Sequence, residues 1–128
     1  MIKIILITLI TLPLLSQEYY FYKNKDEKEF LTPINQIFRD NKEISYYKMK
    51  NNIIIGVSDK IIVKTDINFN INDLISKFQL KILKKLSKNV YLLQTKDKSL
   101  TLDTANRLNE NINIKYAHPD FIKQMIRR

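Results

Sequence analysis

The sequence predicts an α+β protein whose second half is a ferredoxin-like βαββαβ antiparallel sheet with two helices on one face, preceded by a small β-hairpin extension. Residues 60–116 read in the order strand, helix, strand, strand, helix, strand, which folds naturally into that arrangement. The first and third of these strands are the most apolar, as the two central strands of the arrangement should be. The preceding residues read as short strands joined by turns.

A first hairpin is predicted around residues 23–26, which are polar. Residues 19–22 are rich in aromatic side chains with high β-propensity, and residues 28–31 provide the returning arm. The chain contains seven tyrosines, which we interpret as side chains that pack the faces of small sheets. A ligand-binding surface is the alternative interpretation.

A second hairpin is predicted around Lys50 and Asn51. Its arms are residues 44–49 and 52–57, and asparagine tolerates the left-handed backbone that a tight hairpin turn needs. Between the two hairpins, residues 33–38 are compatible with one helical turn.

The first helix of the second half is predicted from its apolar spacing. Ile71, Leu74, Ile75 and Phe78 follow the i, i+3, i+4, i+7 pattern. Asn70 precedes them and is expected to cap the helix. One face of this helix is therefore expected to be buried.

A second helix is predicted to begin near residue 100 and to end at residues 109–111. Leu102, Ala105 and Leu108 are expected to point inward. Ser99 or Thr101 is expected to be the N-cap residue.

The four strands of the second half have different patterns. Residues 61–64 are β-branched, residues 80–86 form a lysine-rich edge strand, and residues 90–94 are apolar on both faces. Residues 112–116 alternate between apolar and polar, as a half-buried strand does. Because the helices cover one face only, the other face needs a cover, which is either the N-terminal hairpins or another protein.

The formal net charge of +9 would ordinarily suggest nucleic acid or an anionic membrane as a partner. Ile, Lys and Asn can be encoded by A and T alone, and they make up 52 of the 128 residues. A compositional bias therefore explains much of the charge, and no nucleic-acid partner is predicted. The densest group, Lys81, Lys84, Lys85 and Lys88, is interpreted as a solvated edge, with a phosphate-binding patch as the alternative.

The N-terminus has the pattern of a secretory signal peptide. Lys3 supplies a positive start, residues 4–15 are an apolar run of 12 residues, and Ser16 precedes a predicted cut before Gln17. The run is shorter than the roughly 20 residues of a membrane-spanning helix. We therefore expect a secreted or periplasmic protein without a stable membrane anchor after cleavage.

The side chains that most catalytic and metal sites require are scarce. The chain has no cysteine and one histidine, which excludes disulfides, thiolate zinc sites and histidine clusters. His118 is interpreted as part of a turn or tail, so that no Asp-His-Ser triad can be assembled and no enzymatic activity is predicted. Asp26, Glu27 and Glu29 are interpreted as a solvated turn rather than a metal site, and no cofactor is predicted.

Four segments of the second half form a recognisable set. They are residues 60–64, 86–93, 102–108 and 114–121. Together they resemble the N-terminal propeptide of secreted subtilisin-like serine proteases, most closely the fervidolysin-type prodomains of bacterial enzymes. The resemblance covers about residues 58–122, and its most specific part is Tyr-Ala-His-Pro-Asp-Phe, which begins at Tyr116.

The resemblance implies inhibition of a subtilisin-like serine protease and assistance to its folding. In that family the propeptide sheet packs on two surface helices of the protease, and the segment after the last strand lies through the active-site cleft. The matching tail is Tyr116, Ala117, His118, Pro119, Asp120, Phe121, Ile122, Lys123 and Gln124. The expected docking face of the sheet is Ile62, Lys64, Tyr91 and Leu93.

The resemblance also implies a division of the chain. The expected parts are a signal peptide (1–16), a hairpin extension (17–58), a propeptide-like α+β domain (59–118) and a tail (119–128). A precursor of this family continues into its catalytic domain, so the chain is a free-standing inhibitor, a piece of a split or truncated precursor without activity, or an excised region. From another class, the alternative is a cationic envelope protein that binds anionic lipid or polysaccharide through its lysines.

Overall fold

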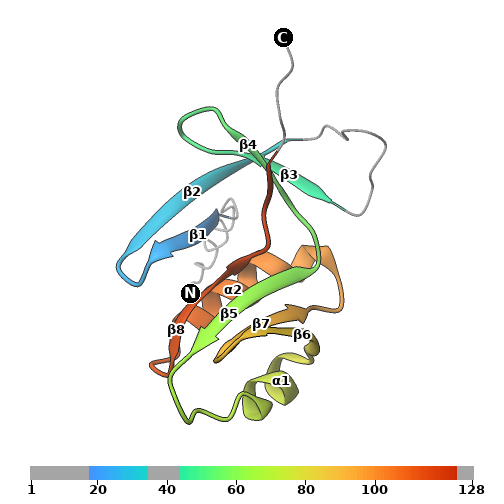
Figure 1. The fold of residues 1–128 in the computed structure, drawn as a ribbon. Coiled ribbons are helices and arrows are strands. Elements are labelled where there is room, and N and C mark those ends of the chain that lie inside the picture. The colour runs from blue at the N-terminus through green and yellow to red at the C-terminus, as the bar shows by residue number, and fades with distance from the viewer. Residues whose placement is uncertain (1–17, 35–43, 124–128) are drawn as a thin grey trace, which may run out of the picture.

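The computed structural model describes residues 18–34 and 44–123, which form two antiparallel sheets and two helices (Figure 1). The predicted α+β class is confirmed. The strands are β1 (Tyr19–Asn24), β2 (Glu27–Ile34), β3 (Ser45–Lys48), β4 (Ile54–Val57), β5 (Lys60–Thr65), β6 (Lys81–Ser87), β7 (Val90–Gln94), β8 (Ile114–Pro119) and β9 (Ile122–Lys123). The helices are α1 (Asn72–Phe78) and α2 (Thr101–Asn109), and a 3-10 turn, Lys98–Leu100, leads into α2.

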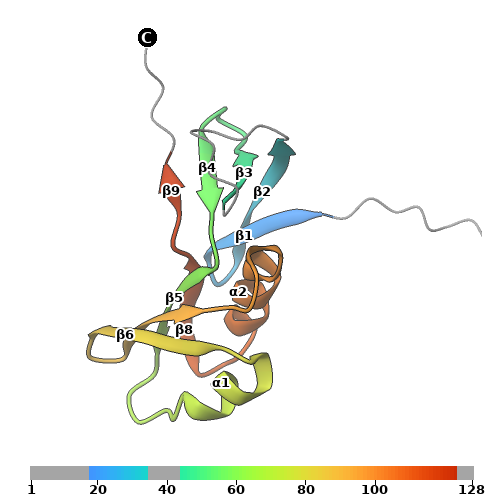
Figure 2. The ribbon, with the colours of Figure 1, turned by 90° about the vertical axis from the view of Figure 1, so that its right-hand side faces the viewer.

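The four-stranded sheet has the order β6-β7-β5-β8, so β7 and β5 are its central strands. Both helices pack on the same face of this sheet, which Figure 2 shows from the side. Ile61 and Val63 of β5 and Leu93 of β7 are fully buried there. Leu74 of α1 and Leu108 of α2 complete the centre of this first core, because the apolar stripe of each helix faces the sheet.

The five-stranded sheet has the order β1-β2-β3-β4-β9 and contains both predicted hairpins. The turn of the second hairpin is longer than predicted, because Met49 pairs with Ile53, and Asn52 rather than Asn51 has the left-handed backbone, with φ 69°.

The fifth strand of this sheet comes from the C-terminal end of the described chain, which no sequence pattern predicted. Ile55 and Val57 of this sheet form a second core with Leu102 of α2. Helix α2 therefore lies between the two sheets, and Leu102 faces away from the first core that buries Ala105 and Leu108.

Ser58 and Asp59 join the two sheets, and hydrogen bonds hold this junction. The hydroxyl of Thr101, which is fully buried, donates to the carbonyl oxygen of Ser58 at 2.7 Å. The backbone N–H of Thr95 donates to the carbonyl oxygen of Asp59 at 2.8 Å. Gln94 Nε2 donates to Asp59 Oδ2, also at 2.8 Å. The junction is thus fixed to the end of β7 and to the start of α2.

The helix caps differ from the prediction. Helix α2 has no side-chain N-cap, and neither Ser99 nor Thr101 takes that role. Because a 3-10 turn runs directly into α2, the polar cap acts earlier, where Asp97 accepts a hydrogen bond from the backbone N–H of Ser99 at 2.9 Å. Asn70 accepts from the N–H of Asn72 at 2.9 Å, one residue before the N-cap position of α1.

The last strand of the four-stranded sheet begins later than predicted. β8 starts at Ile114, and Ile112 is 88% exposed. The register between β5 and β8 shifts at this end, so that Lys115 is an extra residue in a β-bulge. The bulge turns Tyr116 away from the core that buries Ile114. The predicted alternation through residue 116 is therefore wrong.

Three predicted features fall wholly or partly outside the described residues. The signal peptide, residues 1–16, lies outside them. Of the helical turn predicted at residues 33–38, the first two residues belong to β2 and the rest lie outside the described residues. The last residue of the predicted cleft segment, Gln124, also lies outside them.

Candidate functional site

The face of the four-stranded sheet opposite the helices is the first part of the candidate site. We call it the open face, and its residues are Ile62, Lys64, Val90, Leu92, Tyr116 and His118. Residues directly opposite each other in antiparallel strands point to the same side, and Ile62, for example, pairs with Leu92 and with His118. Figure 2 shows no further layer of described residues on this side.

The predicted docking residues lie on two different faces of the sheet. Ile62 and Lys64 belong to the open face. Tyr91 and Leu93 point to the opposite face, because Tyr91 pairs with Val63, a residue of the first core. Leu93 is fully buried in that core, so the four residues do not form one docking surface.

Val90 and Leu92 are the β7 residues of the open face, and sequence analysis did not select them. Both are half-buried. Strand β7 is apolar at four successive positions, so its sequence carries no alternation that separates the two faces. Only the register against β5 identifies which side each residue takes.

The first four residues of the predicted tail are part of β8. Ala117 is 1% exposed, and the side-chain amide of Asn109 holds its backbone. Asn109 Oδ1 accepts a hydrogen bond from the Ala117 N–H at 2.9 Å, and Asn109 Nδ2 donates to the Ala117 carbonyl oxygen. Pro119 is fully buried as well. This part of the predicted tail is therefore built into the fold and is not a free segment.

The remaining described tail residues cross to the five-stranded sheet (Figure 1). The backbone N–H of Asp120 donates to the carbonyl oxygen of Lys60 at 2.9 Å. β9 then pairs with β4 over two residues, with Ile122 opposite Gly56. The tail is thus a short edge strand of the N-terminal sheet, which the boundary predicted at residue 119 did not anticipate.

A row of rings leads from the open face to the five-stranded sheet. Tyr116 stacks on His118 with 5.4 Å between ring centroids, and His118 stacks on Phe121 at 6.2 Å. Phe121 contacts Phe21 of β1 at 4.7 Å. His118 therefore lies within a strand and a ring stack, not in the turn or tail predicted for it.

The N-terminal strands cover the outer side of α2 instead of the open face. Asn106 Nδ2 donates to the carbonyl oxygen of Tyr20 at 2.9 Å, which fixes β1 to the helix. Lys25 Nζ donates to the carbonyl oxygen of Asn109 at 2.6 Å, at the C-terminus of α2. Of the two covers considered for the second face, the described hairpins therefore reach it only at His118, through the rings of Phe121 and Phe21.

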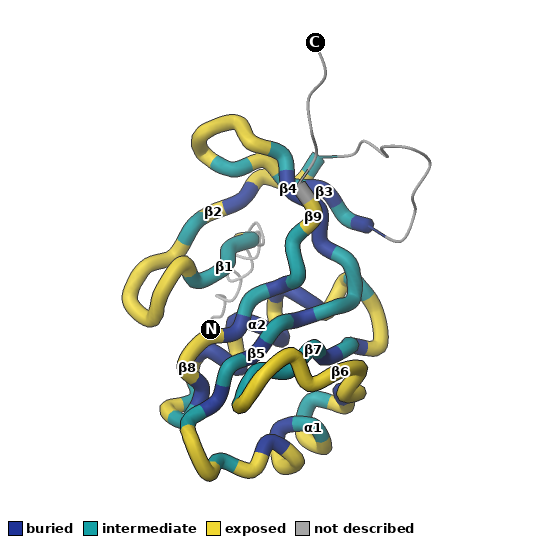
Figure 3. The backbone as a smooth tube through the Cα atoms, in the orientation of Figure 1, coloured by how far each residue is buried: buried dark blue, intermediate teal, exposed yellow. Residues whose placement is uncertain are grey.

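The lysine-rich strand β6 is an exposed edge. All seven of its residues are exposed, as Figure 3 shows. The register against β7 shifts twice along its length. Bulges and lysines are the features that keep an edge strand from pairing with other chains. This arrangement favours the interpretation of Lys81, Lys84, Lys85 and Lys88 as a solvated edge.

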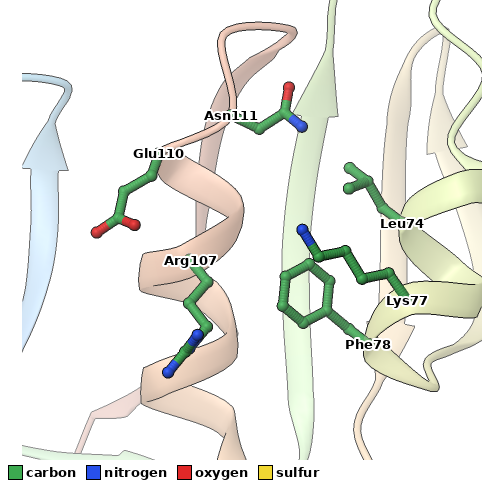
Figure 4. A pocket seen from close by; sticks show the side chains of 6 residues that line it. All are labelled: Leu74, Lys77, Phe78, Arg107, Glu110 and Asn111. Atoms are coloured by element: carbon green, nitrogen blue, oxygen red, sulfur yellow. The ribbon is translucent and has the colours of Figure 1, made fainter.

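A groove between α1 and α2 encloses about 300 Å³ (Figure 4). Leu74, Lys77 and Phe78 project from α1 toward α2. On α2, Arg107 Nε donates to Asp103 Oδ2 at 2.8 Å, and this hydrogen bond raises the pKa of Arg107. The arginine is thus already paired with Asp103, and the groove is lined by charged and polar side chains as well as by Leu74 and Phe78.

Of the three acidic residues predicted to form a solvated turn, Asp26 is an exposed turn residue, whereas Glu27 and Glu29 belong to β2 and the Glu29 side chain is only 14% exposed. Lys23 Nζ lies 3.7 Å from Glu27 Oε2 and 3.7 Å from Glu29 Oε1. Among residues 18–34 and 44–123, no three His, Cys, Asp or Glu side chains are grouped to hold a metal ion. Neither described helix is long and apolar enough to span a membrane.

No protein-family model, curated protein or solved structure matches the chain. The geometry therefore carries the functional argument. It offers an apolar sheet face, the backbone of a short terminal strand beside it, and lysines around the edge. These features suit the binding of another protein's surface.

Proposed function

We propose that the chain is a propeptide-like inhibitor and chaperone-type module of a subtilisin-like serine protease. The open face docks on the catalytic domain, and the segment after β8 reaches the active-site cleft. The observation that carries this proposal is the half-buried apolar face, which the described hairpins reach only at His118, next to the C-terminal segment. In this proposal the protein acts after export, outside the cytoplasm.

The fold supports a finer assignment within the same proposal. The order β6-β7-β5-β8, with both helices in one core, supports a ferredoxin-like arrangement of residues 60–119. An arrangement of this kind leaves one sheet face for a partner. The hairpins are then an N-terminal extension that packs against α2.

Two contributions to the free energy of binding are expected, burial of apolar side chains and tethering of the tail beside the cleft. Complete burial of an exposed apolar side chain contributes about 1.5–3 kcal/mol, and Leu92 and Val90, which are already half-buried, would contribute roughly half of that each on docking. Docking of the open face also holds the terminal segment at high effective concentration beside the cleft, so its backbone pairing adds affinity. A protein that binds only the folded protease stabilises it by mass action, which makes inhibition and folding assistance one activity.

The first test is titration of residues 17–128 against subtilisin and against the subtilisin-like proteases of the same genome, with a peptide substrate as readout. Leu92→Glu places a charge in the proposed interface and should weaken inhibition roughly 30-fold or more. Ile112→Glu is the matched control, because Ile112 is 88% exposed in a loop. Equal inhibition by both variants would remove the open face from the mechanism.

A truncation separates the face from the tail. A chain ending at Phe121 keeps β8 and the contact of Phe121 with Phe21, whereas a chain ending at Tyr116 would lose the buried residues Ala117 and Pro119. The chain ending at Phe121 should still bind the protease and should no longer block the cleft. Undiminished inhibition would show that the residues after Phe121 are dispensable.

The exposed lysines of β6 favour a second candidate, a cationic envelope protein that binds anionic lipid or polysaccharide. Exposed charges are screened within about 10 Å at 0.1 M salt. Binding to anionic vesicles that disappears in moderate salt, together with no effect on any protease tested, would support this candidate. No binding to either target would favour a precursor fragment without activity.

A further inference from the structure

β9 is held by few contacts. It is a two-residue strand, and it pairs with β4 at two positions. Ile122, one of those two residues, is 39% exposed. Pro119, three residues earlier, is fully buried in the four-stranded sheet. Asp120 and Phe121 are also held, by a backbone hydrogen bond to Lys60 and by the ring contact with Phe21. The chain is therefore anchored firmly up to Phe121 and loosely beyond it.

Gly56 of β4 provides the space in which β9 packs, and we call this contact between Gly56 and Ile122 the seat of β9. It is the single glycine of the chain, and its φ is not positive, so backbone freedom is not the reason for it. A Cβ at this position would lie 2.7 Å from Ile44 Cγ2 and 3.1 Å from Tyr46 Cε1. It would lie 3.4 Å from the Cβ of Ile122. The missing side chain thus lets β3 and β9 close over β4.

We propose that β9 is an exchangeable strand, which β4 holds in the free protein and which leaves β4 when the tail enters the partner's cleft. This inference rests on the proposed function and concerns the regulation of the same tail. Only Asp120 and Phe121 separate β8 from β9, so a cleft-binding segment that begins directly after β8 includes the residues that β4 holds. β9 pairs with β4 along one edge, and a cleft that encloses the extended segment on both sides leaves no place for β4, so the segment must leave β4 to enter it.

The exchange makes the strength of inhibition depend on β4. When only a fraction of the molecules has the binding-competent conformation, the apparent affinity for the partner is the intrinsic affinity multiplied by that fraction. A variant that locks β9 on β4 should therefore weaken inhibition, and a variant that loosens β9 should strengthen it. Neither change needs to alter the open face.

A disulfide lock tests this directly, because the chain contains no other cysteine. Gly56→Cys with Ile122→Cys places the two Cβ atoms about 3.4 Å apart, close to the range of disulfides. Ile44→Ala is included to make room for the new side chain. The oxidised protein should inhibit subtilisin-like proteases at least about tenfold more weakly than the same protein after reduction. The reduced form is the matched control, since its sequence is identical.

A loosening variant tests the opposite direction. Gly56→Ala pushes against Ile44 and Ile122 and leaves the tail sequence unchanged. It should inhibit more strongly than the original chain, and the backbone amide of Lys123 should exchange its hydrogen faster. Far-UV circular dichroism checks that the variant is folded. If Gly56→Ala is not folded, the disulfide variant alone tests the exchange.

The outcomes separate the two proposals. Failure of the unaltered chain and of the reduced lock to inhibit any protease would overturn the proposed function. Inhibition that is equal in the oxidised and reduced forms would overturn the exchange and leave the proposed function standing. A cysteine pair that does not oxidise in the folded protein would contradict the seat of Ile122 on Gly56 and so overturn the exchange as well.

Discussion

The two sheets of this protein are stabilised in different ways. The first core, between the four-stranded sheet and both helices, is aliphatic, and Ile61, Val63, Leu93 and Leu108 are fully buried in it. The second core has four buried residues, and half-buried aromatic side chains such as Phe121 surround them. The second sheet also takes its fifth strand from the far end of the chain.

This difference indicates which segments of the molecule can open locally while the rest stays folded. A segment opens at a cost set by the apolar contacts and hydrogen bonds that it breaks. We therefore expect the four-stranded sheet, which presents the open face, to open at a higher cost than the five-stranded sheet. Because β9 belongs to the five-stranded sheet, its release should leave the first core intact.

The largest effect is expected from a matched pair of core substitutions. Leu93→Ala in the first core should lower the free energy of unfolding by about 3–4 kcal/mol, because it leaves a cavity among fully buried side chains. Leu31→Ala in the second core should cost about 2 kcal/mol, since Leu31 is 7% exposed and its aromatic neighbours can move in. Urea unfolding followed by circular dichroism measures both.

The two variants should also differ in which part opens. Leu31→Ala should speed amide hydrogen exchange in β1 to β4 while β5 and β7 stay protected. Leu93→Ala should speed it throughout. Equal costs and uniform exchange in both variants would mean that the two sheets form one cooperative unit, which would contradict the comparison.

The second pair concerns two buried asparagines of α2. Asn109 makes two hydrogen bonds to the backbone of Ala117. Asn106 makes one to Tyr20, and its Oδ1 has no partner among the described residues. Asn109→Ala should cost about 2–3 kcal/mol, because it leaves two buried backbone groups unpaired. Asn106→Ala should cost about 1 kcal/mol.

Thermal unfolding of both variants measures this difference. Asn109 ties α2 to the four-stranded sheet, and Asn106 ties it to β1, so the pair compares the two sides of one helix. A larger cost for Asn106→Ala than for Asn109→Ala would place the stronger polar attachment of α2 on the five-stranded sheet.

Local patterns predicted most elements of the fold, and long-range register did not follow from them. The helix around Leu74 and the hairpin at Asn51 depend on neighbours within a few residues, which the sequence shows directly. The faces of β7 depend on its register against β5, and its unbroken apolar run hides that register. The bulge at Lys115 reverses the alternation in β8, and it too is visible only in the pairing of β8 with β5.

The candidate site was predicted less completely than the fold. Ile62 and Lys64 of the predicted docking face do share one face of the sheet, because alternation within one strand is local. The tail was expected to lie in a partner's cleft, because the resemblance implies that position, and no local pattern marks residues 122–123 as a strand. Their pairing with β4 joins segments more than sixty residues apart, and only the packing around Gly56 accounts for it.

The smallest effect is expected at the junction of the two sheets, where Asp59 titrates. Burial raises the pKa of Asp59, but hydrogen bonds from Gln94 and Lys60 outweigh burial and hold the pKa below its ordinary value. A lowered pKa in the folded state means that the ionised carboxylate stabilises the fold at pH values above 3.8, the ordinary pKa. This contribution is lost as the pH falls from there through the folded pKa. Because the side chain is 30% exposed, about 0.5–1 kcal/mol is expected.

Asp59→Asn isolates this contribution from the other carboxylates. The original chain should be more stable than the variant at pH 6, and the difference should shrink as the pH falls below 3.8, as measured by urea unfolding at each pH. Gln94→Met removes the shorter of the two hydrogen bonds, 2.8 Å against 3.1 Å for Lys60, and keeps the charge, so it should lose part of the pH-dependent difference. A stability difference between the original chain and the Asp59→Asn variant that stays constant across this range would show that the junction is held by the backbone bonds of Ser58 and Asp59 alone.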